Sequence, residues 1–302
     1  TEEKNAEELR AKDSEEAIDL GEEKVPEPVG VPADFDLATI NTIAKDNAGN
    51  YYGVKTYGNS YGDTDIFKTY YKITEAQYNE VAKSCFMVFK RADGEPFKLQ
   101  GVKISTSHID DDNLKDGVTA GPIFTEIQFK HHMAYRLGFL LNNSPLKVDG
   151  QEELTWSITL KKDWVIERCP DFSDNSSPDY AYVNYNVEID GGGHKIYRKD
   201  DGVTGILQLG SGMSGQNVPV RTAKIKDLTI EGNNKYYGIE LSQKGRLNLE
   251  NVKIENCYAD KNHYYYGGAI KLNDGAQLTM DADTSISNCK ANIGGAIRLL
   301  DN

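Results

Sequence analysis

Four cysteines, five histidines and several runs of acidic residues are the parts of this chain that could do chemistry. The acidic runs at 63–65 and 110–113 do not match the spacing of a calcium-binding loop, so exposed loop acids are expected there. No cysteine belongs to a Cys-x-x-Cys pair or has a histidine at metal-ligand spacing. The cysteines are Cys85, Cys169, Cys257 and Cys289. The sequence therefore predicts no catalytic residue, no metal site and no cofactor.

Two of the cysteines occupy the same place in a repeated segment. The residues Ile-Glu-Asn-Cys at 254–257 return as Ile-Ser-Asn-Cys at 286–289, 32 residues later. If the two copies stack, Cys257 and Cys289 lie close enough for a disulfide bond. Stacked thiols also serve as an inward ladder of small apolar side chains. The sequence favours the ladder and leaves the disulfide as the alternative.

Tyrosine is overused, with 18 copies against 9 phenylalanines. Two groups of tyrosines, at 236–237 and 264–266, directly precede Gly238 and Gly267. We therefore expect these tyrosines to occupy the same loop of adjacent repeats and to stack into a surface ridge. Tyrosine gives a large contact area with little entropy loss and stacks on sugars, so all the grouped tyrosines are candidate ligand-binding residues. The alternative is a structural ladder that covers the side of the fold. The candidates are Tyr180, Tyr182, Tyr185, Tyr236, Tyr237, Tyr264, Tyr265 and Tyr266.

The elements that would position these residues follow from a repeat in the second half of the chain. Gly-Gly-Ala-Ile-Lys-Leu at 267–272 returns as Gly-Gly-Ala-Ile-Arg-Leu at 294–299, 27 residues later. Each copy alternates apolar and polar residues, as a strand with one buried face does. A period of about 30 residues that holds about three strands and no helix fits one coil of a parallel β-helix. The alternation extends back, more weakly, to Trp156.

Two motifs carry a family resemblance. Asp-Gly-Gly-Gly-His-Lys-Ile at 190–196 resembles the turn that opens the helix in bacterial pectate-lyase-like proteins. The Ser-Asn-Cys and Gly-Gly-Ala-Ile units are similar to the short repeats of polymorphic outer-membrane proteins and related bacterial surface adhesins. The resemblance covers about the second half of the chain and implies a right-handed parallel β-helix. That fold hosts lyases, hydrolases, adhesins and phage tail spikes, so it implies no single activity.

The residues that mark the enzymes of this fold are missing from the repeat region. A polygalacturonase-type hydrolase would need clustered aspartates together with Gly-His-Gly and Arg-Ile-Lys segments. The chain has Gly-His-Lys at 193–195 and Lys-Ile-Lys at 224–226 instead. Asp190 stands beside three glycines, where we expect it to form a turn. The side chains expected to point outward carry few carboxylates: Lys271, Asn273, Gln277, Thr279 and Arg298.

The first half of the chain divides in two by composition. Residues 1–34 carry 12 acidic and 4 basic side chains and predict a disordered acidic leader. Residues 35–146 show no repeat and predict a mixed, mostly β domain that caps the solenoid, with a helix at 74–83 and a hairpin from strands at 85–90 and 97–104. Residues 147–302 predict the parallel β-helix, truncated at its C-terminal end.

Charge and hydropathy exclude other classes of function. The chain has a formal charge of −13 and no basic patch, which argues against binding nucleic acid. No apolar run has transmembrane length, which argues against direct membrane insertion. We expect an extracellular, non-enzymatic bacterial cell-surface adhesin, anchored to the cell wall or outer membrane through a region outside this sequence. Its partner would be a host surface or secreted glycoprotein, such as a mucin or an immunoglobulin, or a glycan. The alternative is a pectin-degrading polysaccharide lyase or glycoside hydrolase with active coils partly beyond Asn302.

Overall fold

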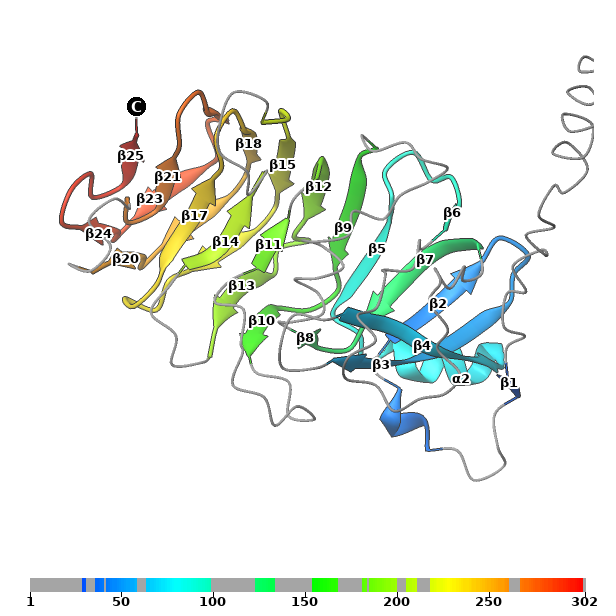
Figure 1. The fold of residues 1–302 in the computed structure, drawn as a ribbon. Coiled ribbons are helices and arrows are strands. Elements are labelled where there is room, and N and C mark those ends of the chain that lie inside the picture. The colour runs from blue at the N-terminus through cyan, green and yellow to red at the C-terminus, as the bar shows by residue number, and fades with distance from the viewer. Residues whose placement is uncertain are drawn as a thin grey trace, which may run out of the picture.

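The computed structural model describes residues 29–30, 36–40, 42–58, 64–98, 123–133, 154–167, 181–183, 185–199, 205–210, 218–260 and 267–300. The described chain is mostly β, and its second half winds into a parallel β-solenoid of about four turns (Figure 1). An N-terminal group of strands, most of them antiparallel, adjoins the first turn. The mostly β class and the solenoid expected from the repeat are thereby confirmed.

The N-terminal group contains one α-helix among its described elements. Thr74 caps that helix, because its hydroxyl accepts a hydrogen bond from the Gln77 amide while the Gln77 side chain accepts one from the Thr74 amide. The sequence predicted this helix from Thr74 as its N-cap and from acidic residues early in the segment, and the structure adds the reciprocal contact of Gln77. The elements are β1 (Val29–Gly30), the 3-10 helix η1 (Leu37–Thr39), β2 (Thr42–Asp46), β3 (Tyr51–Gly58), β4 (Thr64–Ile73), α2 (Glu75–Ala82), β5 (Met87–Arg91), β6 (Phe97–Lys98), β7 (Ile123–Phe129) and β8 (His132–Met133).

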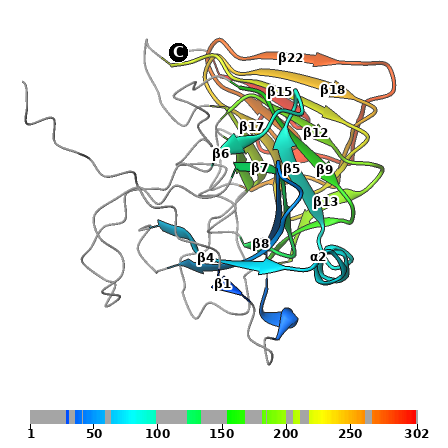
Figure 2. The same cartoon turned by 90° about the vertical axis from the view of Figure 1, so that its right-hand side faces the viewer.

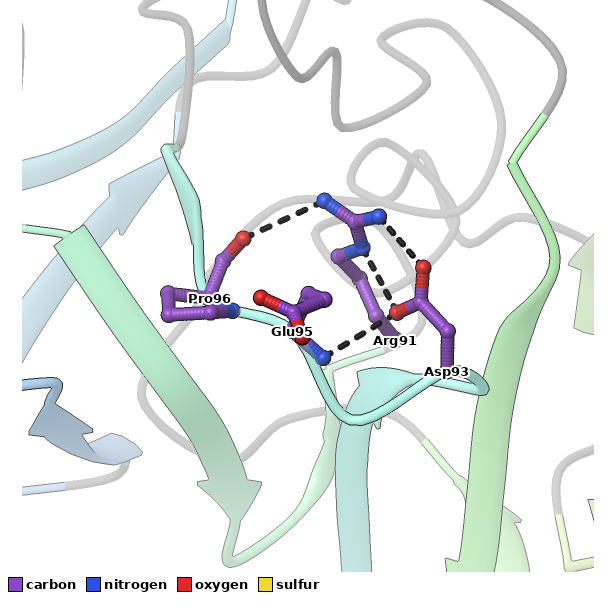
Figure 3. A network of polar contacts seen from close by, with 4 residues as sticks. All are labelled: Arg91, Asp93, Glu95 and Pro96. Carbon is purple, nitrogen blue, oxygen red and sulfur yellow. Dashed lines mark hydrogen bonds and ion pairs between the residues drawn. The ribbon is translucent and has the colours of Figure 1, made fainter.

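The hairpin expected from β5 and β6 is wrong. β5 pairs antiparallel with the C-terminal part of β7, and β6 pairs antiparallel with its N-terminal part, so β5 and β6 run in the same direction. Both edges of β5 are already occupied, by β7 and by the first strand of the solenoid, which leaves no edge for β6. The intervening turn is an excursion held by Arg91, whose guanidinium donates two hydrogen bonds to the Asp93 carboxylate and one, 3.3 Å long, to the Pro96 carbonyl oxygen (Figure 3).

The solenoid has three faces, and on each face the strands of successive turns pair in parallel (Figures 1 and 2). The first face is β9 (Trp156–Leu160), β12 (Val187–Asp190), β15 (Thr222–Lys226), β18 (Arg246–Glu250) and β22 (Gln277–Met280). The second face is β10 (Trp164–Glu167), β13 (Lys195–Arg198), β16 (Thr229–Glu231), β19 (Lys253–Glu255) and β23 (Ser285–Ser287). The third face is β11 (Ala181–Val183), β14 (Gly205–Leu209), β17 (Tyr237–Leu241), β21 (Ile270–Leu272) and β25 (Ile297–Leu299). The short strands β20 (Tyr258–Ala259) and β24 (Lys290–Ala291) form a separate pair.

Apolar side chains repeat in register along the inside of each face. Alternate residues of a strand point to opposite sides, so in-register pairing stacks like residues into rows. Ile270, taken from the repeated Gly-Gly-Ala-Ile unit, is fully buried as the repeat predicted. One buried row of the first face is Ile158, Ile189, Ile225 and Leu249, and one of the second is Trp164, Ile196, Ile230 and Ile254.

Short polar residues make the sharp corners of the coils. Asp227 and Asn251, between the first and second faces, have φ values of 51° each. Asn256 and Asn288, after the second face, have φ values of 55° and 53°. Asparagine and aspartate tolerate this left-handed conformation better than other residues with a side chain. The asparagine of the repeated x-Asn-Cys segment is thus explained by the turn that it makes.

The N-terminal strands and the solenoid share one sheet and the larger of two core clusters; the smaller cluster lies within the N-terminal group. β5 pairs with β9, so the first face continues into a 12-stranded sheet among the described residues. At this junction Phe89 stacks on Trp156 with ring centroids 5.2 Å apart, and Phe97 meets the Trp156 ring edge-on at the same separation. The expected boundary near residue 146 lies outside the described residues.

Candidate functional site

Two of the predicted ligand-binding tyrosines lie at the start of β17. Tyr236 and Tyr237 are only 3% and 4% exposed, so the expectation that they lie on the surface is wrong. The Tyr236 ring centroid is 5.1 Å from the Arg198 guanidinium carbon, a cation–π contact that holds the ring in place. The Tyr237 ring occupies the space that a side chain at Gly205 would need, since a Cβ there would lie 2.0 Å from the ring. Both rings therefore belong to the packing of the solenoid.

A third candidate, Tyr185, also lies in the core. It is 2% exposed, and its ring centroid is 6.4 Å from those of Phe89 and Trp156. Burial raises the pKa of its hydroxyl well above the ordinary value. Tyr185 thus supports the junction between the N-terminal strands and the first turns.

The other candidate tyrosines are not tested by these contacts. Tyr180, Tyr264, Tyr265 and Tyr266 lie outside the described residues, and of Tyr182, in β11, only the backbone is described. Their role in binding stays a prediction. Their place in the chain is nevertheless informative, because it can be set against the order of the faces.

Among the strands that the structure describes in the solenoid, the long connections all lie beside the third face. The connections from the first face to the second are short turns: 161–163, 191–194, 227–228, 251–252 and 281–284. Those from the second face to the third are 168–180, 199–204, 232–236, 256–269 and 288–296, the last two including β20 and β24. Those from the third face back to the first are 184–186, 210–221, 242–245 and 273–276. Tyr180 and the three tyrosines at 264–266 belong to the two longest connections that lead into the third face.

The outward row of the third face contains a buried ion pair. Lys271 Nζ lies 2.7 Å from Glu240 Oε1, and the two side chains are 9% and 11% exposed. Asn273 adds a hydrogen bond of 3.2 Å to the same carboxylate oxygen. The sequence expected Lys271 to face solvent. The structure pairs it in register with the glutamate of the preceding turn and covers both, so this expectation is corrected.

Two carboxylates at the first face are paired with lysines. Asp190 Oδ2 lies 2.8 Å from Lys226 Nζ, and Glu250 Oε1 lies 2.9 Å from Lys224 Nζ. Burial alone would raise the pKa of Asp190, but hydrogen bonds from Lys226 and from the Gly192 amide outweigh it and lower that pKa. The Gly192 bond closes the turn that the sequence expected Asp190 to form. A carboxylate that stays ionised and bonded in this way is a poor general acid.

A polar network joins α2 to the sheet of the N-terminal group. The Tyr78 hydroxyl lies 2.5 Å from Glu126 Oε1 and accepts a hydrogen bond of 3.1 Å from the Gln128 amide. Lys161 donates to the Gln128 carbonyl oxygen at 2.9 Å. Burial and the bond to Glu126 raise the pKa of Tyr78. Each group satisfies another inside the fold, so this network is structural.

Cys257 and Cys289 stack in successive turns as free thiols. Cys257 lies in the core cluster and Cys289 packs against it from a half-buried position, which agrees with the ladder interpretation. Within the described ranges, no three His, Cys, Asp or Glu side chains gather closely enough to hold a metal ion. Across the same residues, no helix has the length and apolar content needed to cross a membrane.

No protein-family model, curated protein or solved structure matches this chain. Function must therefore be inferred from the chain's own residues and from the geometry given above.

Proposed function

We propose that this chain is a binding module of a bacterial cell-surface adhesin, built on a right-handed, pectate-lyase-like β-helix and displayed outside the cell. Its partner would be a host glycoprotein, such as a mucin or an immunoglobulin, or a glycan. The observation that carries the proposal is the confinement of long connections to the two ends of the third face. A solenoid whose insertions gather at one side commonly uses that side for binding.

The tyrosines at 264–266 are the residues most suited to this role. They occupy the connection between β20 and β21, whereas the apolar rows that hold the coils together come from the strands. Tyrosine is frequent in protein-binding surfaces and stacks on sugar rings. Tyr180 belongs to the equivalent connection of an earlier turn and would extend the same surface.

An enzyme of the same fold is the competing proposal, and no feature of the described residues favours it. Asp190 and Glu250 on the first face are each engaged by a lysine, so neither is available as a free acid or base. The two proposals separate in one assay. Incubation with pectin and host glycans, with and without calcium, should release neither reducing nor unsaturated ends; release of either would overturn the adhesin proposal.

Binding is tested with a triple variant and a matched control. Tyr264→Ser, Tyr265→Ser and Tyr266→Ser together should abolish binding to the mucin, immunoglobulin or glycan selected from an array, because a buried interface tyrosine contributes about 2 kcal/mol or more. Tyr258→Ser is the control, since Tyr258 is exposed in β20 near the same connection. Affinity and melting temperature are measured together. Unchanged affinity in a folded triple variant would remove these tyrosines from the binding surface.

A further inference from the structure

Cys257 and Cys289 are adjacent in space because their turns are in register. The residues that follow the two cysteines, Tyr258 and Lys290, are partners in the parallel pair β20–β24. The Lys290 amide donates a hydrogen bond of 2.8 Å to the Cys257 carbonyl oxygen. Partner Cα atoms in neighbouring parallel strands lie about 4.8 Å apart, which is within the range that a disulfide bridge spans. Two free thiols therefore stand at bridging distance in successive turns.

The two thiols differ in their access to solvent. Cys257 is 1% exposed and contacts the Glu255 carbonyl oxygen at 3.5 Å inside the core. Cys289 is half-buried, so part of it faces solvent. Its Sγ lies 3.2 Å from the Ser287 carbonyl oxygen and 3.7 Å from the Ile254 carbonyl oxygen of the preceding turn. The Cys289 side chain therefore reaches back toward the turn that contains Cys257.

The contact between the two thiols also shifts their pKa values in opposite directions. The side-chain contact with Cys257 lowers the pKa of Cys289 against the opposing effects of burial and of the Glu231 carboxylate. The same contact, burial, and the Glu231 and Glu255 carboxylates raise the pKa of Cys257. The thiolate is the nucleophilic form of cysteine, so Cys289 is the member of the pair suited to attack.

We propose that Cys289 and Cys257 form a redox modification site that reacts with small-molecule disulfides of the glutathione class. The Cys289 thiolate attacks one sulfur of the disulfide, forms a mixed disulfide and releases one thiolate. Cys257 then loses its proton to solvent and attacks the Cys289 sulfur, which closes the Cys257–Cys289 bond and releases the second thiolate. Two protein thiols are oxidised and one external disulfide is reduced to two thiols. The bridge would join one turn of the solenoid to the next and is independent of the proposed adhesin function.

The experiment uses oxidised glutathione at neutral pH, followed by peptide mapping with mass spectrometry. Wild type should yield the Cys257–Cys289 bridge, Cys257→Ser should accumulate a glutathione adduct on Cys289, and Cys289→Ser should leave Cys257 unmodified. Because serine places a hydroxyl in the core, Cys257→Ala serves as a second variant with the same expected adduct. Cys85 is the internal control: it is fully buried, and burial raises its pKa to about 11, so it should stay unmodified.

Three results would overturn the proposal. In the first, the Cys289→Ser variant forms a glutathione adduct on Cys257 as fast as the Cys257→Ser variant forms one on Cys289. Equal rates would mean that Cys289 is not the cysteine that attacks first. Another is a stable mixed disulfide without a bridge in wild type. The third is no reaction at either cysteine while a denatured sample of the same protein reacts at both.

Discussion

Side chains in this fold interact with side chains of the neighbouring turn, and the buried ion pair between Glu240 and Lys271 is one example. Glu240→Ala should destabilise the protein by about 3 to 5 kcal/mol, because it leaves the Lys271 ammonium buried without its acid. The double variant Glu240→Leu with Lys271→Met should recover much of the loss, since an apolar pair of similar volume carries no uncompensated charge. Urea unfolding measures both. A single variant as stable as wild type would mean that the pair contributes nothing.

Also at the residue scale, Asp46 couples stability to pH. Burial alone would raise its pKa, but hydrogen bonds from Asn50, Tyr52 and the Ala48 amide outweigh it and lower that pKa. A lowered folded-state pKa gives stability that is present above the unfolded value of about 4 and is lost as pH falls through the folded value. Asp46→Asn should therefore lose less free energy of unfolding between near-neutral pH and acid than wild type does. Parallel pH curves for the two proteins would contradict this.

At the scale of the element, each strand of the third face must fit the strand of the next turn. Gly205→Ala in β14 should cost about 1 to 3 kcal/mol, because the added methyl group meets the buried Tyr237 ring. Gly295→Ala, beside the same face in the last described turn, is the control, since the nearest atom to its Cβ lies at 3.8 Å. Thermal melting compares the two. Equal losses would show that the close packing of Gly205 against Tyr237 does not limit stability.

The elements were largely predictable from sequence, and their surroundings were not. Alternation and the repeat place Trp156–Leu160 as a strand and Ile270 inside, because strand parity and stacking depend only on nearby residues. The burial of Lys271 depends on what covers the outward row of the third face, and the burial of Tyr236 depends on packing against the core and against Arg198 of the preceding turn. The alternation of side chains along a strand assigns each residue to one side of the sheet, but it does not indicate whether that side is exposed to solvent. The pairing of β6 depends on the edges of β5 being filled by distant strands, which no local pattern encodes.

At the scale of the whole molecule, the shared sheet predicts that the N-terminal strands and the solenoid unfold together. β5–β9 pairing and the aromatic cluster around Trp156 make one continuous core. Trp156→Ala should cost about 3 to 5 kcal/mol and lower the stability of both parts equally. Native-state hydrogen exchange measures this through the slowest amides of β2 and of β17, which report one global opening if the parts are coupled.

A matched substitution far from the junction completes that test. Ile254→Ala removes a fully buried side chain from β19, in the middle of the solenoid. If the molecule is one cooperative unit, Ile254→Ala should speed hydrogen exchange of the slowest β2 amides. For each kcal/mol of lost stability, the increase should equal the increase that Trp156→Ala causes. Exchange in β2 that is unchanged by Ile254→Ala would show that the N-terminal strands fold independently, despite the sheet and core that they share with the first turn.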